Sequence, residues 1–232
     1  MQLQSPLKLW VIRWGPYPRR VLLYLKIKGV PNEDIEIVNM EFTATGGMSG
    51  DPDKPAGSVP MLQLEDGSLI RQSMGILQYL EERFAHIGSN MSGTSALERA
   101  QIRDMCSLVD EAAAQTHVYM SHASKIFTRL NPHQSKVEAE RSEALRDKAL
   151  RTLADWTSDT RGFLMGGENP TLPDIVLFAL MQSYRVFYGD DIGKSMPRLE
   201  DFYNKMSGLD GTEAPEYPAH MESIAKQRVV EL

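Results

Sequence analysis

Residues 54–84 read KPAGSVPMLQLEDGSLIRQSMGILQYLEERF, and they decide how the first part of the chain folds. Two short apolar runs, Val59–Glu65 and Ser68–Ile70, flank the pair Asp66-Gly67, which is typical of a tight hairpin turn. From Gln72 to Phe84 the apolar side chains recur at helical spacing. The stretch therefore predicts a β-hairpin that leads directly into an amphipathic helix.

The residues before this stretch predict a β-α-β unit. Leu7–Arg13 is apolar enough for a buried strand and ends at the turn-forming pair Gly15-Pro16. Because proline suits the first turn of a helix, a helix is expected next, closed by Gly29. Glu33–Met40 predicts a second strand, and residues 43–58 form a loop rich in Gly, Ser, Asp and Pro. The expected order is β-α-β, a loop, then β-β-α.

The remainder of the chain predicts helices only. After a polar linker, residues 85–95, apolar or small side chains recur over residues 96–127 at alternating steps of three and four, which indicates one long helix. Asp174–Tyr184 is apolar almost all round, as in a buried helix, and follows the capping box Thr171–Asp174. Residues 208–218 are expected to be irregular before a last short helix. Another helix is marked by Val137, Leu145, Ala149, Leu153 and Trp156.

The composition excludes several classes of protein. The chain has 232 residues and a net charge of −6, without a stripe of Lys and Arg, so we expect no nucleic-acid partner. Its longest apolar run, Ile175–Met181, has seven residues, far short of the roughly 20 that cross a membrane. The five histidines are scattered and no HExxH or CxxC occurs, so no metal site is expected. The single cysteine, Cys106, favours a reducing compartment, which makes a cytoplasmic location the expectation.

Taken in order, four segments resemble motifs of the glutathione transferase superfamily: Lys54–Pro60, Gln72–Glu82, Gly162–Leu164 with Thr171–Asp174, and Pro197–Leu199. The resemblance covers nearly the whole chain. It implies an α+β fold, in which a thioredoxin-like glutathione-binding domain (βαβ-ββα) occupies residues 1–84. After the linker at 85–95, an all-α helical domain over residues 96–232 is expected to shape the second-substrate site. The Gln-Ser pair before Ile-Leu-x-Tyr-Leu is most similar to the zeta class, whose members include glutathione-dependent cis–trans isomerases.

Two features of the opening stretch suit an extended peptide ligand. Val59-Pro60 is a candidate cis peptide bond that turns the strand edge outward and leaves the N–H and C=O of Val59 free to pair with a tripeptide. Gln72 and Ser73 open a helix, whose N–H groups and dipole favour a carboxylate. The resemblance implies glutathione as the ligand, with its γ-glutamyl group at Gln72 and Ser73 and its glycine carboxylate at Lys54. The alternatives are a proline that only starts an edge strand, a serine N-cap without a ligand, and a solvated lysine.

The sequence departs from the family at the group that stabilises the glutathione thiolate. In the cysteine and serine classes this group lies five residues before an arginine of the first helix, and counting back from Arg20 reaches Gly15. Tyr17 is the candidate catalytic residue, because its phenol can donate an O–H. The helix N-terminus can also lower a thiol pKa, and Arg13 can add positive potential. A purely packing role, or a place in the pocket wall, is the alternative for Tyr17.

A second-substrate pocket is expected between the turn at residues 14–17 and the long helix. Methionine side chains would make such a pocket adaptable, although core packing is the alternative for them. Cys106, on the same helix, is expected to be a small core residue. The candidate pocket residues are Arg13, Trp14, Met105, Tyr119 and Met120.

These features lead to two hypotheses for function. In the first, an enzyme adds the glutathione thiolate to an electrophilic carbon of a small apolar molecule, either as conjugation or as reversible addition that isomerises a conjugated alkene. In the second, a glutathione-binding or protein-interaction module has kept the fold and lost catalysis, as Gly15 suggests. The family resemblance also implies a homodimer.

Overall fold

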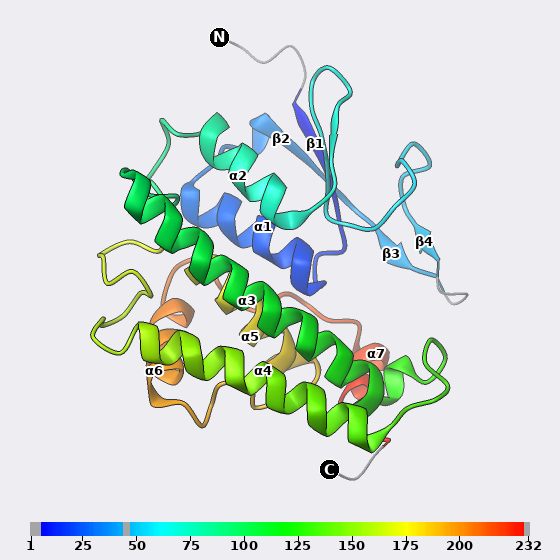
Figure 1. Cartoon of the computed structure of the whole chain (residues 1–232). Coiled ribbons are helices and arrows are strands. Elements are labelled where there is room, and N and C mark those ends of the chain that lie inside the picture. The colour runs from blue at the N-terminus through cyan, green and yellow to red at the C-terminus, as the bar shows by residue number, and fades with distance from the viewer. Residues whose placement is uncertain (1–5, 44–46, 230–232) are drawn as a thin grey trace. The chain divides into compact units, whose positions relative to one another are not determined.

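The computed structural model describes residues 6–43 and 47–229 (Figure 1). The chain divides into two compact units, Met1–Ser92 and Gly93–Leu232. The division falls inside the segment predicted as a linker. Each unit is described separately below.

The first unit is built on a four-stranded mixed sheet in the order β2-β1-β5-β6. The central strand β1 pairs in parallel with β2 and antiparallel with β5, and β5 pairs antiparallel with β6. The strands follow the predicted order, although β2 begins two residues late because a 3-10 turn occupies Asn32–Asp34. The strand bounds are Leu7–Val11 (β1), Ile35–Asn39 (β2), Met61–Gln63 (β5) and Leu69–Ile70 (β6).

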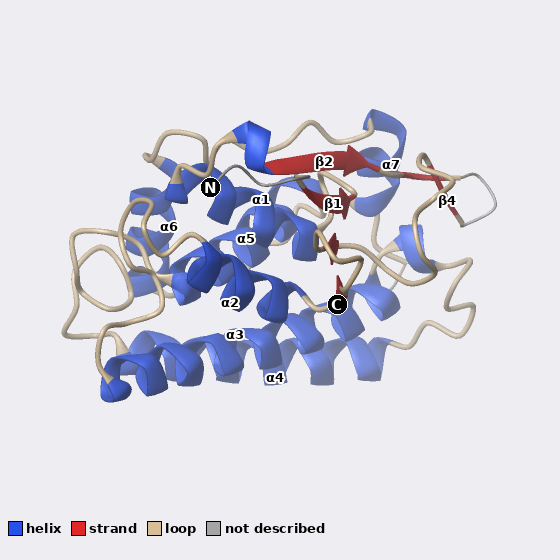
Figure 2. Ribbon diagram, turned by 90° about the horizontal axis from the view of Figure 1, so that it is seen from above, coloured by secondary structure: helices blue, strands red, loops and turns tan. Residues whose placement is uncertain are grey.

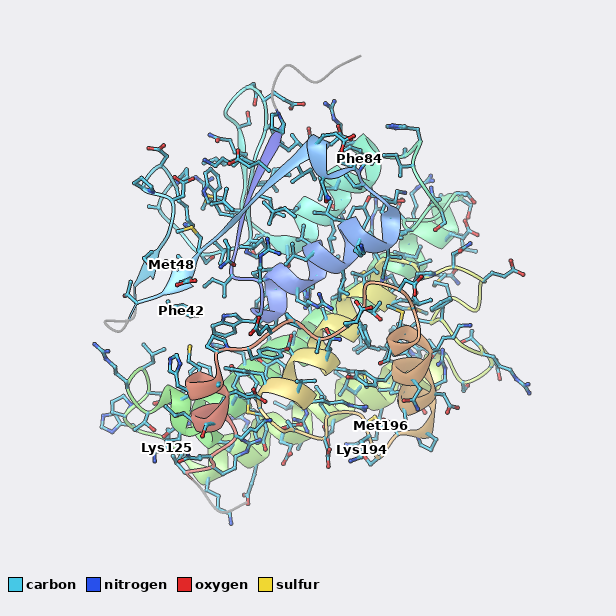
Figure 3. The ribbon with its side chains drawn as sticks, turned by 180° about the vertical axis from the view of Figure 1, so that it is seen from behind. Phe42, Met48, Phe84, Lys125, Lys194 and Met196 are labelled. Carbon is cyan, nitrogen blue, oxygen red and sulfur yellow. The ribbon has the colours of Figure 1, made fainter. Side chains whose placement is uncertain are left out.

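A second, two-stranded sheet lies partly in the segment predicted as a loop. Its strands are β3 (Glu41–Phe42) and β4 (Met48–Ser49), which pair antiparallel. Both strands are exposed, so their residues carry no alternation of buried and exposed side chains that could have predicted them. Phe42 and Met48, labelled in Figure 3, belong to this pair of strands.

Two helices of the first unit run parallel to each other. α1 (Pro16–Lys28) begins with proline and ends at Gly29, whose φ of 78° needs the conformational freedom of glycine. Arg20 near the start of α1 lies against Ser73, the first residue of α2 (Ser73–Arg83). At the other end, Lys28 of α1 is paired with Glu81 of α2. Because the start of α1 contacts the start of α2 and the end of α1 contacts the end of α2, the two helices run in the same direction. Figure 1 shows α1 beside α2.

The ion pair between Lys28 and Glu81 is completely enclosed. Lys28 Nζ lies 2.9 Å from Glu81 Oε2 and donates to the Ser89 carbonyl at 2.8 Å. The remaining capacity of the carboxylate is used by the Tyr24 hydroxyl at 2.9 Å and by the Met91 N–H at 2.7 Å. Removing one member of such a pair leaves a buried charge and costs about 3–5 kcal/mol. The cluster therefore fixes α1, α2 and residues 89–91 to one another.

The second unit is built from helices, and within its described residues it has no named strand. α3 begins with a capping box formed by Ser95 and Glu98, and it ends four residues earlier than predicted, where a 3-10 turn takes over at Lys125–Phe127. α3 and α4 lie side by side (Figure 2). α5 is buried along nearly its whole length. The helix bounds are Ala96–Ala123 (α3), Lys136–Trp156 (α4), Leu172–Phe187 (α5), Pro197–Ser207 (α6) and Ala219–Ala225 (α7).

The helix predicted from Val137, Leu145, Ala149, Leu153 and Trp156 is present as α4, but these residues do not share one buried face. Ala149 and Leu153 are buried, whereas Val137, Leu145 and Trp156 are exposed. The buried face contains small and polar residues instead, so apolar side chains alone do not mark it. This buried face comprises Ala139, Ser142, Arg146, Ala149, Leu150 and Leu153.

Two of the four segments that carried the family resemblance meet in one hydrogen-bond network. The buried carboxylate of Asp174 accepts the N–H and the hydroxyl of Thr171 and the N–H of Leu164, each at 2.7 Å. Arg198, in the last of the four segments, donates to the carbonyls of Gly162 and Phe163. These residues therefore hold the start of α5, the loop before it and the start of α6 together.

Along the described residues, no helix is both long enough and apolar enough to cross a membrane.

Asp51 ties the loop before the hairpin to the central strand. Its Oδ2 accepts the indole N–H of Trp10 at 2.9 Å and lies 2.6 Å from Lys8 Nζ. Its Oδ1 accepts the N–H of Asp53 at 2.9 Å. These bonds, first among them the one from Lys8, lower the pKa of Asp51 to about 2. The segment that leads to Lys54 is thereby anchored on β1.

We predict that Asp51→Asn makes the protein less sensitive to acid. A carboxyl group whose pKa is lowered by folding contributes stability above its unfolded pKa of about 4, and that contribution is lost as the pH falls through about 2. Urea midpoints, followed by tryptophan fluorescence from about pH 4 to about pH 2, should fall less steeply for the variant than for the wild type. Asp53→Asn, at an exposed neighbour, is the control and should follow the wild type. If the urea midpoints of Asp51→Asn and the wild type fall equally steeply with pH, the proposed stabilising role of the Asp51 carboxylate is wrong.

Candidate functional site

The N-termini of the two parallel helices lie next to each other. Arg20 connects them: its Nη1 is 3.5 Å from Ser73 Oγ, and its guanidinium lies 4.8 Å from the centre of the Tyr17 ring. Arg20 and Ser73 are buried, whereas Tyr17 is 39% exposed. A helix N-terminus carries a partial positive charge, so two of them beside a guanidinium make this end of the unit electropositive. Such a place suits an anion.

The first turns of both helices leave few hydrogen-bond donors free, and their positions are specific. In α1, Pro16 and Pro18 have no N–H, and the Arg19 N–H is bonded to the Gly15 carbonyl. Tyr17 is therefore the residue of this turn that can offer both a backbone N–H and a hydroxyl. In α2, Gln72 occupies the N-cap position without a capping bond from its side chain, so the first N–H groups of that helix are also available.

Val59 lies beside this end of the unit with an unpaired backbone. The Val59-Pro60 bond is cis, as the sequence predicted. The β1–β5 pairing ends at Trp10 and Met61, and within the described residues the N–H and C=O of Val59 make no backbone hydrogen bond. The Val59 side chain packs against the same apolar cluster as Trp14, which fixes its position. An extended peptide can pair with this free edge.

Lys54 is held by its own loop. Its Nζ donates to the carbonyls of Gly57 at 2.6 Å and Pro55 at 2.9 Å, and partial burial lowers its pKa. An ammonium group has three donors, so one remains for a ligand. The alternative of a freely solvated lysine does not match these bonds.

Arg13 and Trp14, predicted for the second-substrate pocket, both belong to the first unit. Arg13 is exposed, and its N–H donates to Asn39 Oδ1 at 3.2 Å. The half-buried Trp14 ring lies 5.6 Å, between centroids, from the ring of Phe42. Trp14 therefore presents an aromatic surface that an apolar molecule can use, together with a residue that the sequence did not single out.

The other predicted pocket residues lie on α3 and differ in surroundings. Met105 is half-buried, whereas Met120 is completely buried in the position of a core residue, and Cys106 is buried as expected. Tyr119 lines a polar cavity of the helical unit, with its ring centre 5.1 Å from the Arg146 guanidinium. Burial is the main cause that raises the Tyr119 pKa to about 12. This placement differs from the apolar wall expected for Tyr119.

Two residues that organise the site were missed from the sequence. Arg20 served only as a reference for counting, although Tyr17 and Arg20 are three residues apart on one helix, a spacing that brings side chains together. Arg20 contacts Ser73, which is 53 positions away in the chain, so no local sequence pattern predicts this contact. The same holds for Asp51, which is 41 positions from Trp10.

Comparison with known proteins finds similarity to glutathione S-transferases. Residues 14–83 match the family described as glutathione S-transferase, N-terminal domain. Glutathione S-transferase 4 of Caenorhabditis elegans is 28% identical over 181 residues, which is 78% of this chain and 80% of that protein. Maleylacetoacetate isomerase of Pseudomonas aeruginosa is 31% identical over 107 residues, 44% of this chain and 48% of that protein.

A similar fold occurs in solved structures. A glutathione transferase family member from Pseudomonas fluorescens, solved with bound glutathione, superimposes with a TM-score of 0.73 at 19% identity. The superposition covers 90% of this chain and all of the other. The first unit is thus similar in sequence to the N-terminal domain of glutathione S-transferases, and the chain as a whole has the fold of glutathione transferases.

Proposed function

We propose that the chain is a glutathione-dependent enzyme that presents the thiolate of glutathione at the paired N-termini of α1 and α2. The observation that carries this proposal is the contact of Arg20 with both Tyr17 and Ser73, because it places two helix N-termini and one cation at a single point. The C. elegans relative is named a glutathione S-transferase, and the P. fluorescens structure contains glutathione.

The residues around this point fit the parts of glutathione. Ser73 and the free N–H groups of α2 would hold the γ-glutamyl carboxylate, with Gln72 beside it. The free edge of Val59, next to Pro60, would pair with the extended backbone of the tripeptide. The third donor of Lys54 would bind the glycine carboxylate. Each of these groups has capacity left after its internal bonds are counted.

Tyr17 is the proposed catalytic residue. It is partly exposed at the start of α1 and carries the available donors of that turn, as the two prolines show. A hydroxyl that donates to sulfur favours the thiolate over the thiol, and the charge of Arg20 acts in the same direction. A side chain at residue 15 would be crowded, because a Cβ there would lie 3.2 Å from Pro18 Cδ. The donor expected at residue 15 has thus been replaced two positions later.

Two reactions follow from a thiolate at this position. It forms a C–S bond with an electrophilic carbon of a small apolar molecule, and the adduct is then released as a conjugate. Alternatively, addition to a conjugated alkene converts the double bond to a single bond that rotates, after which the C–S bond breaks and returns the thiolate. The Gln-Ser pair and the similarity to maleylacetoacetate isomerase favour the second reaction. Trp14 is proposed to contact the electrophile.

We further propose that the enzyme acts as a homodimer in the cytoplasm, which rests on the family and on the single buried cysteine. The second candidate function is a glutathione-binding module without catalysis. The observation that favours it is the glycine at residue 15.

Mass analysis of products distinguishes these functions. The protein is incubated with glutathione and either alkylating electrophiles or cis-configured conjugated alkenes. Isomerisation is expected to leave the mass of the alkene unchanged and to consume no glutathione, whereas conjugation gives a product that contains glutathione. If the protein turns over neither class of compound but still binds glutathione in calorimetry, the enzyme hypothesis is wrong and the non-catalytic module is supported.

Ser73→Ala should weaken glutathione binding about tenfold, because a hydrogen bond to a carboxylate contributes about 1.5–3 kcal/mol. Isothermal titration calorimetry measures the dissociation constant directly. Ser68→Ala, in the exposed hairpin turn, is the matched control and should bind as the wild type does. Equal affinities for both variants would remove Ser73 from the proposed site.

Tyr17→Phe should lower kcat roughly 10- to 100-fold with little change in the KM for glutathione, because the phenol is proposed to act on the sulfur and not on the peptide. Steady-state kinetics with the preferred electrophile provide both constants. The matched control is Tyr79→Phe, which removes the same hydroxyl group from a tyrosine on α2. This variant should leave kcat unaltered. If Tyr17→Phe retains full turnover, the catalytic assignment fails while glutathione binding stands.

A further inference from the structure

Asp51 and Lys54 begin and end one tight turn in the loop before the β-hairpin. Residues 51–54 read Asp-Pro-Asp-Lys, and an acid followed by proline favours the first two positions of a β-turn. The Lys54 N–H donates to the Asp51 carbonyl at 3.3 Å, and the Asp53 N–H donates to Asp51 Oδ1 at 2.9 Å. The Asp51 carboxylate therefore fixes the backbone of the turn that carries Lys54.

The other oxygen of this carboxylate ties the turn to the central strand of the sheet. Asp51 Oδ2 accepts the indole N–H of Trp10 at 2.9 Å and lies 2.6 Å from Lys8 Nζ. Trp10 also faces Met61 in the antiparallel register of β1 and β5. Both ends of the loop from Asp51 to Met61 are thus held by one residue of β1. Closing a loop at both ends restricts the residues in between.

Lys54 lies inside this closed loop, and its side chain is fixed as well. Its Nζ donates to the carbonyls of Pro55 and Gly57, so two of the three ammonium donors are used within the loop. Gly57 has a φ of 125°, which only glycine adopts readily, and this backbone sets the position of its carbonyl. The remaining donor of Lys54 therefore has a defined place in the loop that also contains Val59.

We propose that Asp51 is a positioning residue for the glycine carboxylate of glutathione, because it holds the turn that places the free donor of Lys54. This inference rests on the proposed function, in which Lys54 binds that carboxylate. Asp51 itself does not contact the ligand, since two carboxylates repel each other, and its charge is paired with Lys8. The consequence is selectivity for glutathione over γ-glutamylcysteine, the thiol peptide that lacks glycine.

A positioning role and a charge effect predict opposite results for Asp51→Asn. The substitution removes a negative charge near Lys54 and releases Lys8, and by simple electrostatics both changes would strengthen the binding of an anion. Loss of the anchor weakens binding instead, because Lys54 is no longer held in place. Asp51→Ala removes every bond of the carboxylate, whereas the amide oxygen of Asp51→Asn can still accept an N–H, so the alanine variant should be weaker.

The test is calorimetric titration of the full chain with glutathione and, separately, with γ-glutamylcysteine. The wild type should bind glutathione about tenfold more tightly, because only glutathione has the glycine carboxylate. The dissociation constant of glutathione should rise about fivefold in Asp51→Asn and about tenfold in Asp51→Ala, with γ-glutamylcysteine unaffected. Asp53→Asn removes the same charge from an exposed neighbour in the turn and is the matched control, which should bind both peptides as the wild type does.

A double variant separates positioning from a general structural effect. In a Lys54→Ala background, the further change Asp51→Asn should leave the glutathione affinity unaltered, because the effects of residues that act through one another are not additive. Thermal unfolding of each sample checks that it is folded. Asp51→Asn, which retains part of the hydrogen bonding, decides the question if Asp51→Ala does not fold.

Unchanged or tighter binding of glutathione by Asp51→Asn would overturn the proposal. An equal loss of affinity for both peptides, or additive effects in the double variant, would overturn it too. If the wild type prefers glutathione and the Asp51 variants keep that preference, only this inference fails. If the wild type binds neither peptide, the proposed function fails as well.

Discussion

The buried ion pair between Lys28 and Glu81 is the constraint on which the first unit depends. Because both charges are enclosed, neither can move away without its partner, and α1 and α2 are held parallel. Parallel packing brings two helix N-termini to the same end, where Arg20 and Ser73 meet. The positive ends of the two helix dipoles repel each other there, which costs electrostatic free energy. The ion pair offsets this cost, and a bound anion would lower it further.

The fold was largely predictable from the sequence because its signals are local. Turn residues predict the hairpin, prolines predict the start of a helix, and a run of apolar residues predicts the buried α5. Each of these signals lies within a few positions of the element. Apolar patterns are not informative where burial does not follow hydrophobicity. On α4, Arg146 is buried through its carboxylate partners while Trp156 is exposed, and a pattern of apolar residues cannot reveal that exchange. The exposed strands β3 and β4 were missed for the same reason.

The candidate site was predictable only in its separate pieces. Val59-Pro60 and Gln72-Ser73 are close in the chain, and the motifs identified them together. Arg20, Asp51 and the surroundings of Tyr119 depend on contacts across 41 or more positions or between different helices, and only the structure shows these. Tyr119 illustrates the difference: its place on the inner seam of α3 was correct, but its neighbours are ionic. The periodicity of apolar residues on a helix predicts which side chains are buried, but it does not predict which residues they contact.

The central claim is that the paired helix N-termini, Arg20 and Tyr17 favour the thiolate of bound glutathione. The most direct measurement is the thiol pKa of glutathione bound to the wild-type protein, followed by ultraviolet absorbance of the thiolate as the pH is raised. A free thiol of this kind has a pKa of about 8.5. A bound pKa at least one unit lower is the predicted result. A pKa equal to that of free glutathione, at concentrations where calorimetry shows it to be bound, would contradict the account.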